Sequence, residues 1–397
     1  MSLKEIFCQD KAISILQKGF AADKMPHAYI FAGAEGVGKF KTAREWAKLL
    51  LCKNPATENG FADPSSAAAA SPLPLRRVDN CGLCQSCRLF EAGSHPDFNL
   101  IYKELLEFTK DNKDKKTPLD LAIDVIREFL IDKVSTRPTL SQRRVFIVSE
   151  AERLNASSQN AMLKVLEEPP AYCTIVLLCT RMERLLPTTK SRCRIIRFSH
   201  IDQERIIDQL KAMGLNGEKA QYFARLAQGS LGQGCQWAQL ELADANLYQI
   251  KKELLNSLST YKLADCLDLA EQLLDKSKKI AAAWEDIEKT TSKTDINRRA
   301  QKTLIQIIIS ALHDAMKLNI AGPPRQGEGL AVALESFINS DQKEQIKSIA
   351  NRFSPEQSAE KIADAYKTMH WIESNVNEKL IFEQLLLNLA VSDTIKV

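Results

Sequence analysis

The chain has 397 residues, of which 45% are hydrophobic and 26% charged, values close to those of average soluble globular proteins. That length is too great for one ordinary domain and predicts two or three. The formal charge of +4, from 54 basic and 50 acidic residues, gives no strong electrostatic indication that nucleic acid is a direct ligand. Because no apolar run is long enough to span a bilayer and Met1–Glu5 does not begin a signal peptide, we expect a cytoplasmic protein with no membrane partner.

Short apolar runs in the first 200 residues are rich in β-branched and aromatic side chains, as buried strands are: Ala28–Ala32, Val145–Val148 and Cys173–Leu178. Helical patterns follow the first two runs, over Lys41–Leu51 and over Ser157–Glu168, where two prolines end the helix. This alternation predicts an α/β domain with a mostly parallel sheet and helices on both faces.

Two stretches interrupt the alternation. Asn54–Pro74 is rich in proline, serine and alanine, a composition that indicates a flexible surface insertion. Lys103–Lys116 is rich in charge and is interpreted as a solvated loop or helix end.

Helical periodicity replaces the strand-like runs from about residue 200. Ile201–Leu240 predicts a small three-helix unit around a break at Gly229–Gly232. From Asn246 onward the chain is mostly helical, with its clearest break at Gly322–Pro324. The final helix has an apolar face at Leu380–Leu389, for which periodicity alone favours an ordinary bundle core.

A glycine-rich loop lies between the first strand and the first of these helices. Gly33 and Gly38 have the spacing of a phosphate-binding loop, and Lys39 follows. Glycines let backbone N–H groups converge on phosphate oxygens, while the helix N-terminus and the lysine supply positive charge. The flanking strand and helix make this match specific, although a chance glycine loop is the alternative.

Both protein ligands that normally hold Mg²⁺ at such a loop are missing. Phe40 stands where a Ser or Thr hydroxyl would coordinate the metal, and Thr42 would point to another side of the helix. At the end of the second strand, Ser149 stands where the metal-binding carboxylate should be, followed by Glu150. We therefore expect no Mg²⁺, no ATP hydrolysis, and at most weak nucleotide binding.

Three cysteines at two-residue gaps, Cys81, Cys84 and Cys87, are typical of tight turns around Zn²⁺. Structural zinc requires four ligands, for which Cys52 is the first candidate and His95 the second. An iron–sulfur cluster is the chemical competitor, but its usual fourth cysteine would fall at Glu91. The remaining alternative is three unrelated free thiols.

The order of these motifs carries a family resemblance. After the phosphate loop and the cysteines come Ser149–Asn155, Lys164–Pro170 and Ser191–Cys193. The chain resembles the clamp-loader ATPases, AAA+ proteins of the DNA polymerase III holoenzyme, strongly over about the first 235 residues. The closing Asn375–Leu380 looks like part of the family's collar domain.

The resemblance implies an AAA+ parallel-sheet ATPase-like domain over 1–200, with a zinc module and insertion at about 52–95. A small helical lid over 201–245 and an all-helical, oligomerising collar over 246–397 would follow. The family's zinc module usually has a shorter gap before its close cysteines, so Cys52 matches less well than the others. Gly232 stands where the family's motors carry a lid arginine. With Phe40 and Ser149, this makes three departures at one nucleotide site, which is similar to the delta-prime type and unlike the motor subunits.

The resemblance also gives Arg192 a role, as an arginine finger acting in trans on the ATP site of a neighbouring subunit. Without it, Arg192 is interpreted as a surface charge in a basic stretch. The implied partners are the motor subunits and the delta subunit, the sliding clamp through the assembly, and primer–template DNA indirectly. Two other functions stay open: an active motor subunit of the gamma/tau type, and a zinc-dependent nucleic-acid-binding protein.

Overall fold

The structure is a computed structural model that describes residues 2–57, 60–61, 78–110, 120–289, 291–321, 337–374 and 376–390. The chain divides into two compact units. The first contains residues 1–202 together with 230–232, and the second contains 203–229 and 233–397. The boundary at residue 202 agrees with the end of the strand-rich pattern in the sequence.

A parallel sheet of five strands forms the centre of the first unit, in the order β5-β6-β7-β1-β8. The strands are β1 Ala28–Ala32, β5 Phe98–Ile101, β6 Arg144–Val148, β7 Cys173–Cys179 and β8 Arg194–Arg197. Ala28 pairs with Ile175 and Tyr29 with Arg194, so β1 lies between β7 and β8. The predicted parallel sheet is confirmed, and three of its strands are those that the apolar runs indicated.

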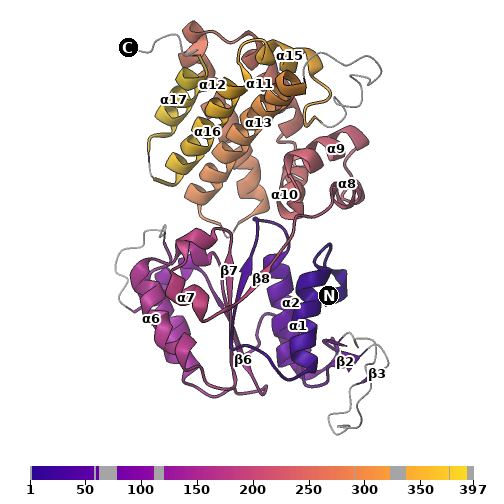
Figure 1. Cartoon of the computed structure of the whole chain (residues 1–397), viewed down its shortest axis with the longest axis vertical. Helices are drawn as coiled ribbons and strands as arrows, with labels where there is room; N and C mark the ends of the chain where they lie inside the picture. The colour runs from indigo at the N-terminus through magenta and orange to yellow at the C-terminus, as the bar shows by residue number, and fades with distance from the viewer. Residues whose placement is uncertain are drawn as a thin grey trace. The chain divides into compact units, whose positions relative to one another are not determined.

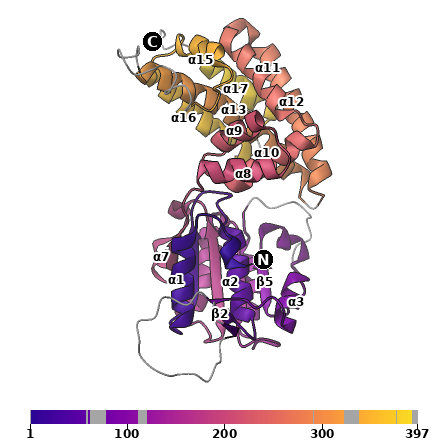
Figure 2. The ribbon, with the colours of Figure 1, turned by 90° about the vertical axis from the view of Figure 1, so that its right-hand side faces the viewer.

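Helices cover both faces of this sheet (Figure 1). They are α1 Asp10–Ala21, α2 Lys39–Leu51, α3 Gln85–Glu91, α4 Ile123–Ile126, α5 Asp132–Val134, α6 Ala156–Glu167 and α7 Pro187–Ser191. Figure 2 shows α1 and α2 in front of the strands.

Alternate residues of each central strand point into two separate apolar cores. In β6, Val145 and Ile147 join the cluster around Trp46 of α2, whereas Phe146 and Val148 join the cluster around Met162 of α6. Because both faces are buried, the strands are apolar throughout. This explains why the sequence shows continuous apolar runs there.

The two interrupting stretches are only partly described. A three-stranded antiparallel sheet contains β2 Ala56–Thr57 and β3 Gly60–Phe61, which lie within the predicted insertion, and β4 Val78–Asp79, which follows it. Most of the insertion lies outside the described residues. Lys103–Phe108 forms a 3₁₀ helix with a buried Lys103, so this part of the charged stretch is less solvated than predicted. Residues 111–119 of that stretch lie outside the description.

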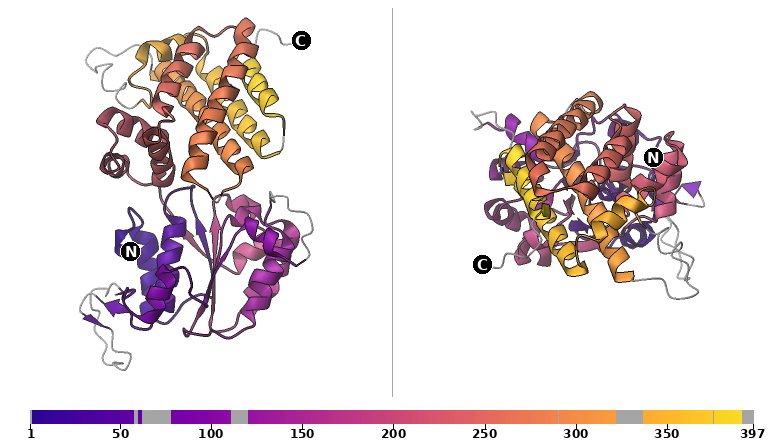
Figure 3. Two further views of the ribbon diagram at one scale, coloured as in Figure 1. Left: turned by 180° about the vertical axis from the view of Figure 1, so that it is seen from behind. Right: turned by 90° about the horizontal axis from the view of Figure 1, so that it is seen from above.

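The second unit is helical, and Figure 3 shows its orange and yellow helices packed alongside one another. Its helices are α8 Gln203–Ala212, α9 Gly217–Leu226, α10 Leu231–Leu242, α11 Leu247–Thr260, α12 Cys266–Ile287, α13 Lys293–Ala321, α15 Lys343–Ala350, α16 Pro355–Trp371 and α17 Glu378–Ala390. The first three correspond to the predicted three-helix unit. The predicted break at Gly322–Pro324 lies outside the described residues.

A buried polar network ties α9 to α11 and α13 through the segment 337–342. Arg225 of α9 donates to the carbonyl of Phe337, the first residue of this segment, at 2.8 Å. Asp314 of α13 accepts from two backbone N–H groups of the same segment. Lys251 of α11 is fully buried and pairs with Asp341. Burial lowers the pKa of Lys251, and the negative charge of Asp341 partly opposes this shift. The residues predicted as lid therefore share one compact unit with those predicted as collar. The division between them stays a prediction.

Within the described ranges, every helix is too short or too polar to cross a membrane.

Candidate functional site

The phosphate loop leaves the carboxyl end of β1 and leads directly into α2, whose first residue is Lys39. Gly38 precedes the helix with φ of 100°, a backbone conformation that favours glycine because a Cβ atom would be strained there. Ligands of parallel α/β sheets bind at the carboxyl ends of the strands. The loop therefore has the location of a nucleotide site.

Lys39 is turned back onto this loop. Its Nζ donates to the carbonyl of Gly33 at 2.8 Å and to that of Ala34 at 2.6 Å, and the side chain is only 8% exposed. Burial lowers the pKa of Lys39, which the negative charges of Glu152 and Glu35 partly oppose. The charge that would meet a phosphate thus bonds to the loop's own carbonyls.

The residues after Lys39 present no hydroxyl to the loop. Phe40 is 44% exposed, and Thr42 is buried with its Oγ1 donating to the carbonyl of Gly38 at 2.9 Å. This hydroxyl satisfies a backbone acceptor of its own helix, as threonines inside helices commonly do.

Acidic residues do follow β6, but each has another partner. Glu150, with φ of 49°, places its carboxylate 3.1 Å from Nε of Arg153. Glu152 accepts from the backbone N–H of Thr180 at 3.1 Å and from its hydroxyl. Thr180 directly follows β7, so this pair closes the carboxyl ends of two neighbouring strands. Ser149 is the first residue after β6.

Gly232, in the first turn of α10, contacts the backbone of the phosphate loop. Its N–H donates to the carbonyl of Gly36 at 2.9 Å. A Cβ atom at position 232 would lie only 2.8 Å from the Cα of Gly36, closer than real side chains approach. The lack of a side chain is therefore what allows α10 to begin against the loop.

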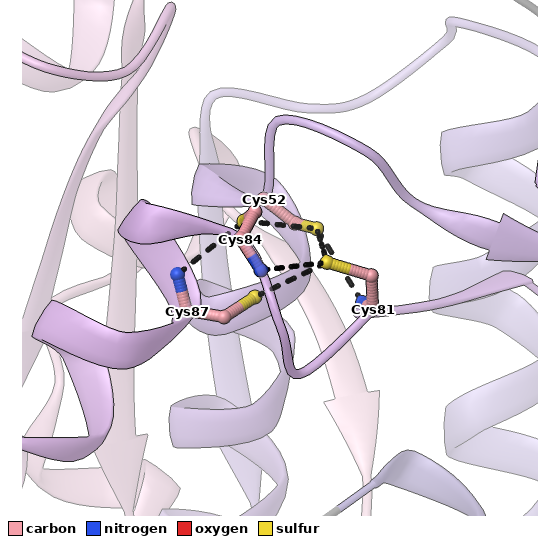
Figure 4. A group of neighbouring side chains, drawn as sticks. All are labelled: Cys52, Cys81, Cys84 and Cys87. Carbon is pink, nitrogen blue, oxygen red and sulfur yellow. Dashed lines mark hydrogen bonds between the residues drawn. The ribbon is translucent and has the colours of Figure 1, made fainter.

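The four cysteines come together at the C-terminal end of α2 and the start of α3 (Figure 4). All four Sγ atoms lie within 4.8 Å of one another, and the separations from Cys52 to Cys81 and to Cys84 are 3.5 and 3.9 Å. Four thiolates at the usual Zn–S distance of about 2.3 Å in a tetrahedron would be about 3.8 Å apart. The arrangement therefore fits a closed zinc site with every position filled by protein.

Hydrogen bonds to sulfur support this interpretation. The backbone N–H groups of Cys81, Cys84 and Cys87 point at the sulfur of Cys52, Cys81 and Cys84 respectively, at 3.4 to 3.5 Å. A hydrogen bond from Cys87 lowers the pKa of the Cys52 thiol to about 5. Donors aimed at a sulfur stabilise its thiolate, the form that binds metal.

His95 lies close to this group but has other partners. Its Nδ1 accepts from the backbone N–H of Asp97 at 3.1 Å, so the proton belongs on Nε2, which lies 2.8 Å from Oγ of Ser86. Ser86 in turn donates to the carbonyl of Leu51, the residue before Cys52. Both ring nitrogens are thus engaged in holding the backbone next to the cysteines. Of the two candidates for a fourth ligand, the structure brings Cys52 and not His95 to the other three.

Arg192 caps the C-terminal end of α7 at the surface. A 3₁₀ turn, Met182–Arg184, and then α7 lead from β7 to this arginine. One guanidinium nitrogen donates to the carbonyl of Thr188 at 2.9 Å, and another lies 2.5 Å from Oε1 of Glu167. Arg192 and the phosphate loop are both in the first unit, on separate elements.

Three features of these sites did not come from the sequence: the Glu152–Thr180 pair, the contact of Gly232 with Gly36, and the pairing of Arg192 with Glu167. Glu167 lies within the motif Lys164–Pro170, so the residue was visible but its partner was not. Pairings across long stretches of chain leave no local pattern in a single sequence.

A family model described as DNA polymerase III, delta subunit, matches residues 8–202. The chain is 35% identical over 167 residues to DNA polymerase III subunit delta' of Pseudomonas aeruginosa, a match covering 42% of this chain and 41% of that protein. Over residues 8–202, just under half of its length, the chain is thus similar to this family of DNA polymerase III subunits.

Two further relatives show how the matches are distributed. Identity is 27% to subunit delta' of Bacillus subtilis, over 55% of this chain and 56% of the relative. The chain is 28% identical to subunit tau of Salmonella typhimurium, a match that covers 68% of this chain and 38% of that protein. The chain thus spans about two fifths to just over half the length of the curated relatives it matches. A gamma subunit-related protein from Thermotoga maritima, at 16% identity, covers 96% of this chain and 98% of its own with a TM-score of 0.37.

Proposed function

We propose that this chain is a non-hydrolysing subunit of the clamp loader of the replicative DNA polymerase III. In this role it helps to load the sliding clamp onto primed DNA and supplies Arg192 to the ATP site of a neighbouring motor subunit. The observation that carries the proposal is a correctly placed phosphate loop that lacks both protein ligands for Mg²⁺. Its partners would be the motor and delta subunits, with clamp and primer–template DNA met through the assembly in the cytoplasm.

The geometry around the loop supports the absence of hydrolysis in three ways. Phe40 has no ligand atom and Ser149 offers no carboxylate, so neither replaces the usual ligands of the Mg²⁺ that neutralises charge on the transferred phosphoryl group. Lys39 bonds to loop carbonyls, and Gly232 stands where the resemblance implies a lid arginine in motor subunits. Any nucleotide would have to displace these contacts and would still find no metal.

The surface position of Arg192 supports its action in trans. Arg192 lies at the end of a short helix, on a different element from the phosphate loop, and its side chain is 32% exposed. A guanidinium presented at an edge can reach a phosphoryl group bound to another subunit. Such fingers are worth on the order of 10³–10⁵ in rate at the site that they complete.

We also propose that Cys52, Cys81, Cys84 and Cys87 hold one structural Zn²⁺. The ion would supply no chemistry, because a closed four-thiolate site leaves no position for water. It would fix the ends of α2 and α3 together next to the buried His95 network.

The main competing function is an active motor of the tau or gamma type, which the match to subunit tau over 68% of this chain favours. ATP turnover by the purified chain separates the two. We expect turnover no faster than background, with Lys39→Ala making no difference. Turnover that disappears in Lys39→Ala would assign the motor function instead. A zinc-dependent nucleic-acid-binding protein would instead show tight DNA binding by the isolated chain with a steep salt dependence.

The role of Arg192 requires the assembled loader. An Arg192→Ala chain, reconstituted with the motor subunits and delta subunit of its organism, should assemble normally because an exposed side chain contributes little to stability. Clamp-stimulated ATPase should fall through the one site that Arg192 completes. Normal assembly with a full ATPase rate would contradict this role.

A further inference from the structure

Helix α6 holds the segment that carries Arg192 at two points. At the start of α7, the buried Gln159 accepts from the backbone N–H of Leu186 at 2.7 Å through Oε1 and donates to the carbonyl of Arg184 at 3.1 Å through Nε2. At the other end, Glu167 pairs with Arg192 at 2.5 Å. Gln159 and Glu167 lie two helical turns apart and therefore project along the same side of α6.

The helix itself is firmly placed. Asn155 caps its N-terminus by accepting from the N–H of Ser158 at 2.8 Å, and Met162 and Leu166 are buried in the apolar cluster on that face of the sheet. Pro169 and Pro170 end it immediately after Glu168. Glu167 therefore directly follows the buried Leu166, and the packing of the helix restricts the movement of its backbone.

We propose that Glu167 is a positioning residue for Arg192. It fixes the guanidinium at the angle from which the remaining N–H groups can reach a phosphoryl group of the neighbouring subunit. This inference rests on the proposed function of Arg192. Glu167 itself touches no nucleotide and acts only through the arginine.

The hydrogen-bonding capacity of arginine makes such a role workable. A guanidinium has five N–H donors in a rigid plane. One nitrogen is engaged with Thr188 and another with Glu167, which fixes the plane while leaving donors for a partner. Without Glu167, the carbonyl of Thr188 and the hydroxyl of Ser191 would hold the guanidinium through a single nitrogen, about which its plane could then rotate among several orientations.

The size of the effect follows from the exposure of the pair. The side chains of Arg192 and Glu167 are 32% and 48% exposed, and water screens such surface pairs. Exposed ion pairs of this kind change equilibria by about two- to five-fold. Loss of Glu167 should therefore slow the shared site by about two- to five-fold, far less than loss of Arg192 itself.

The test uses the reconstituted loader with clamp and primed DNA, and measures ATPase at limiting and saturating ATP. Glu167→Ala should lower kcat without changing the KM for ATP, because it acts on the transition state alone. Glu167→Gln keeps an acceptor oxygen and should recover most of the rate. Glu168→Ala removes the same charge one residue later and serves as the matched control, expected to behave as the parent chain.

A double variant decides whether Glu167 acts through Arg192. Arg192→Ala with Glu167→Ala should be no slower than Arg192→Ala alone. A further loss in the double variant, or a faster rate in Glu167→Ala, would overturn the positioning role. If Arg192→Ala slows the complex and Glu167→Ala does not, the positioning role is wrong while the proposed function stands. If Arg192→Ala has no effect in a normally assembled complex, the proposed role of Arg192 itself fails.

Discussion

Single buried side chains around the cysteine group connect the four cysteines to the sheet. The carboxylate of Asp97, just before β5, is fully buried and accepts from the backbone N–H groups of Thr139, Leu140 and Ser141. Arg144 lies 3.5 Å away. Burial opposes ionisation, but these donors outweigh it and lower the pKa of Asp97. The ionised form is therefore stabilised in the folded state.

Asp97→Asn should lower the free energy of unfolding by about 3 kcal/mol at neutral pH, because it places an NH₂ group among N–H donors and leaves Arg144 unpaired. A lowered pKa in the folded state means that the carboxylate's contribution is fully present above the unfolded value of about 3.9 and disappears as pH falls through the folded value. Denaturation at several pH values should show the difference between variant and parent shrinking below about pH 4. Asp124→Asn, in an exposed pair with Arg127, is the control and should cost little at any pH. A pH-independent difference for Asp97→Asn would contradict this account.

The identity of the fourth ligand of the proposed zinc site gives a second prediction about single residues. Elemental analysis of protein purified without chelator should give about one zinc per chain. Cys52→Ser should remove most of it, because three thiolates bind the ion more weakly than four. His95→Ala should keep the metal and lose only stability, since the ring bonds to Ser86 and to the Asp97 backbone. Retained zinc in Cys52→Ser together with lost zinc in His95→Ala would reverse the assignment.

Among whole elements, the first turn of α10 has little room for a larger residue, because it meets the phosphate loop backbone to backbone. Gly232→Ala forces a Cβ to within 2.8 Å of the Cα of Gly36, where neither atom is the end of a flexible side chain. One of the two segments must move, at a cost of about 1–3 kcal/mol in the free energy of unfolding.

Gly217→Ala provides the matched control for chemical denaturation of this variant. Gly217 begins α9, and a Cβ there would meet no atom within 4 Å. This substitution should be neutral or stabilising by up to about 1 kcal/mol, as alanine favours helices over glycine. Equal stabilities for the two variants would show that the close approach at Gly232 relaxes without cost.

At the scale of the whole molecule, the first unit contains everything that a folded domain needs. Residues 1–202 include all five strands of the parallel sheet, both apolar clusters and the four cysteines. Only residues 230–232 of this unit lie outside that stretch. The sheet and its two covering layers are therefore complete without the helical remainder.

A fragment of residues 1–202 should fold by itself, melt cooperatively and bind about one zinc. A fragment ending at residue 172 lacks β7, which pairs with both β6 and β1, and should not fold. Circular dichroism and elemental analysis of the two fragments provide the comparison. A 1–202 fragment as unstructured as the shorter one would mean that the helical unit is required for the sheet.

Elements with strong local patterns could be predicted from the amino-acid sequence. The apolar runs gave β1, β6 and β7 to within one residue at either end, since these central strands are buried on both faces. It missed β5 and β8, the two edge strands, because an edge strand such as Arg194–Arg197 is mostly exposed and breaks the apolar run with charges. Cysteines at short spacing and the glycine loop were also visible, because their geometry is local.

Contacts between distant groups became known from the fold alone. It brought Cys52 to the three close cysteines while His95 bonded to Ser86, although both stood as candidates in the sequence. It also placed the N–H of Gly232 in a hydrogen bond with the phosphate loop and paired Glu167 with Arg192. Such pairings depend on how helices cross a sheet and on which strand lies next to which. These are properties of packing between remote segments, and no spacing along the chain encodes them.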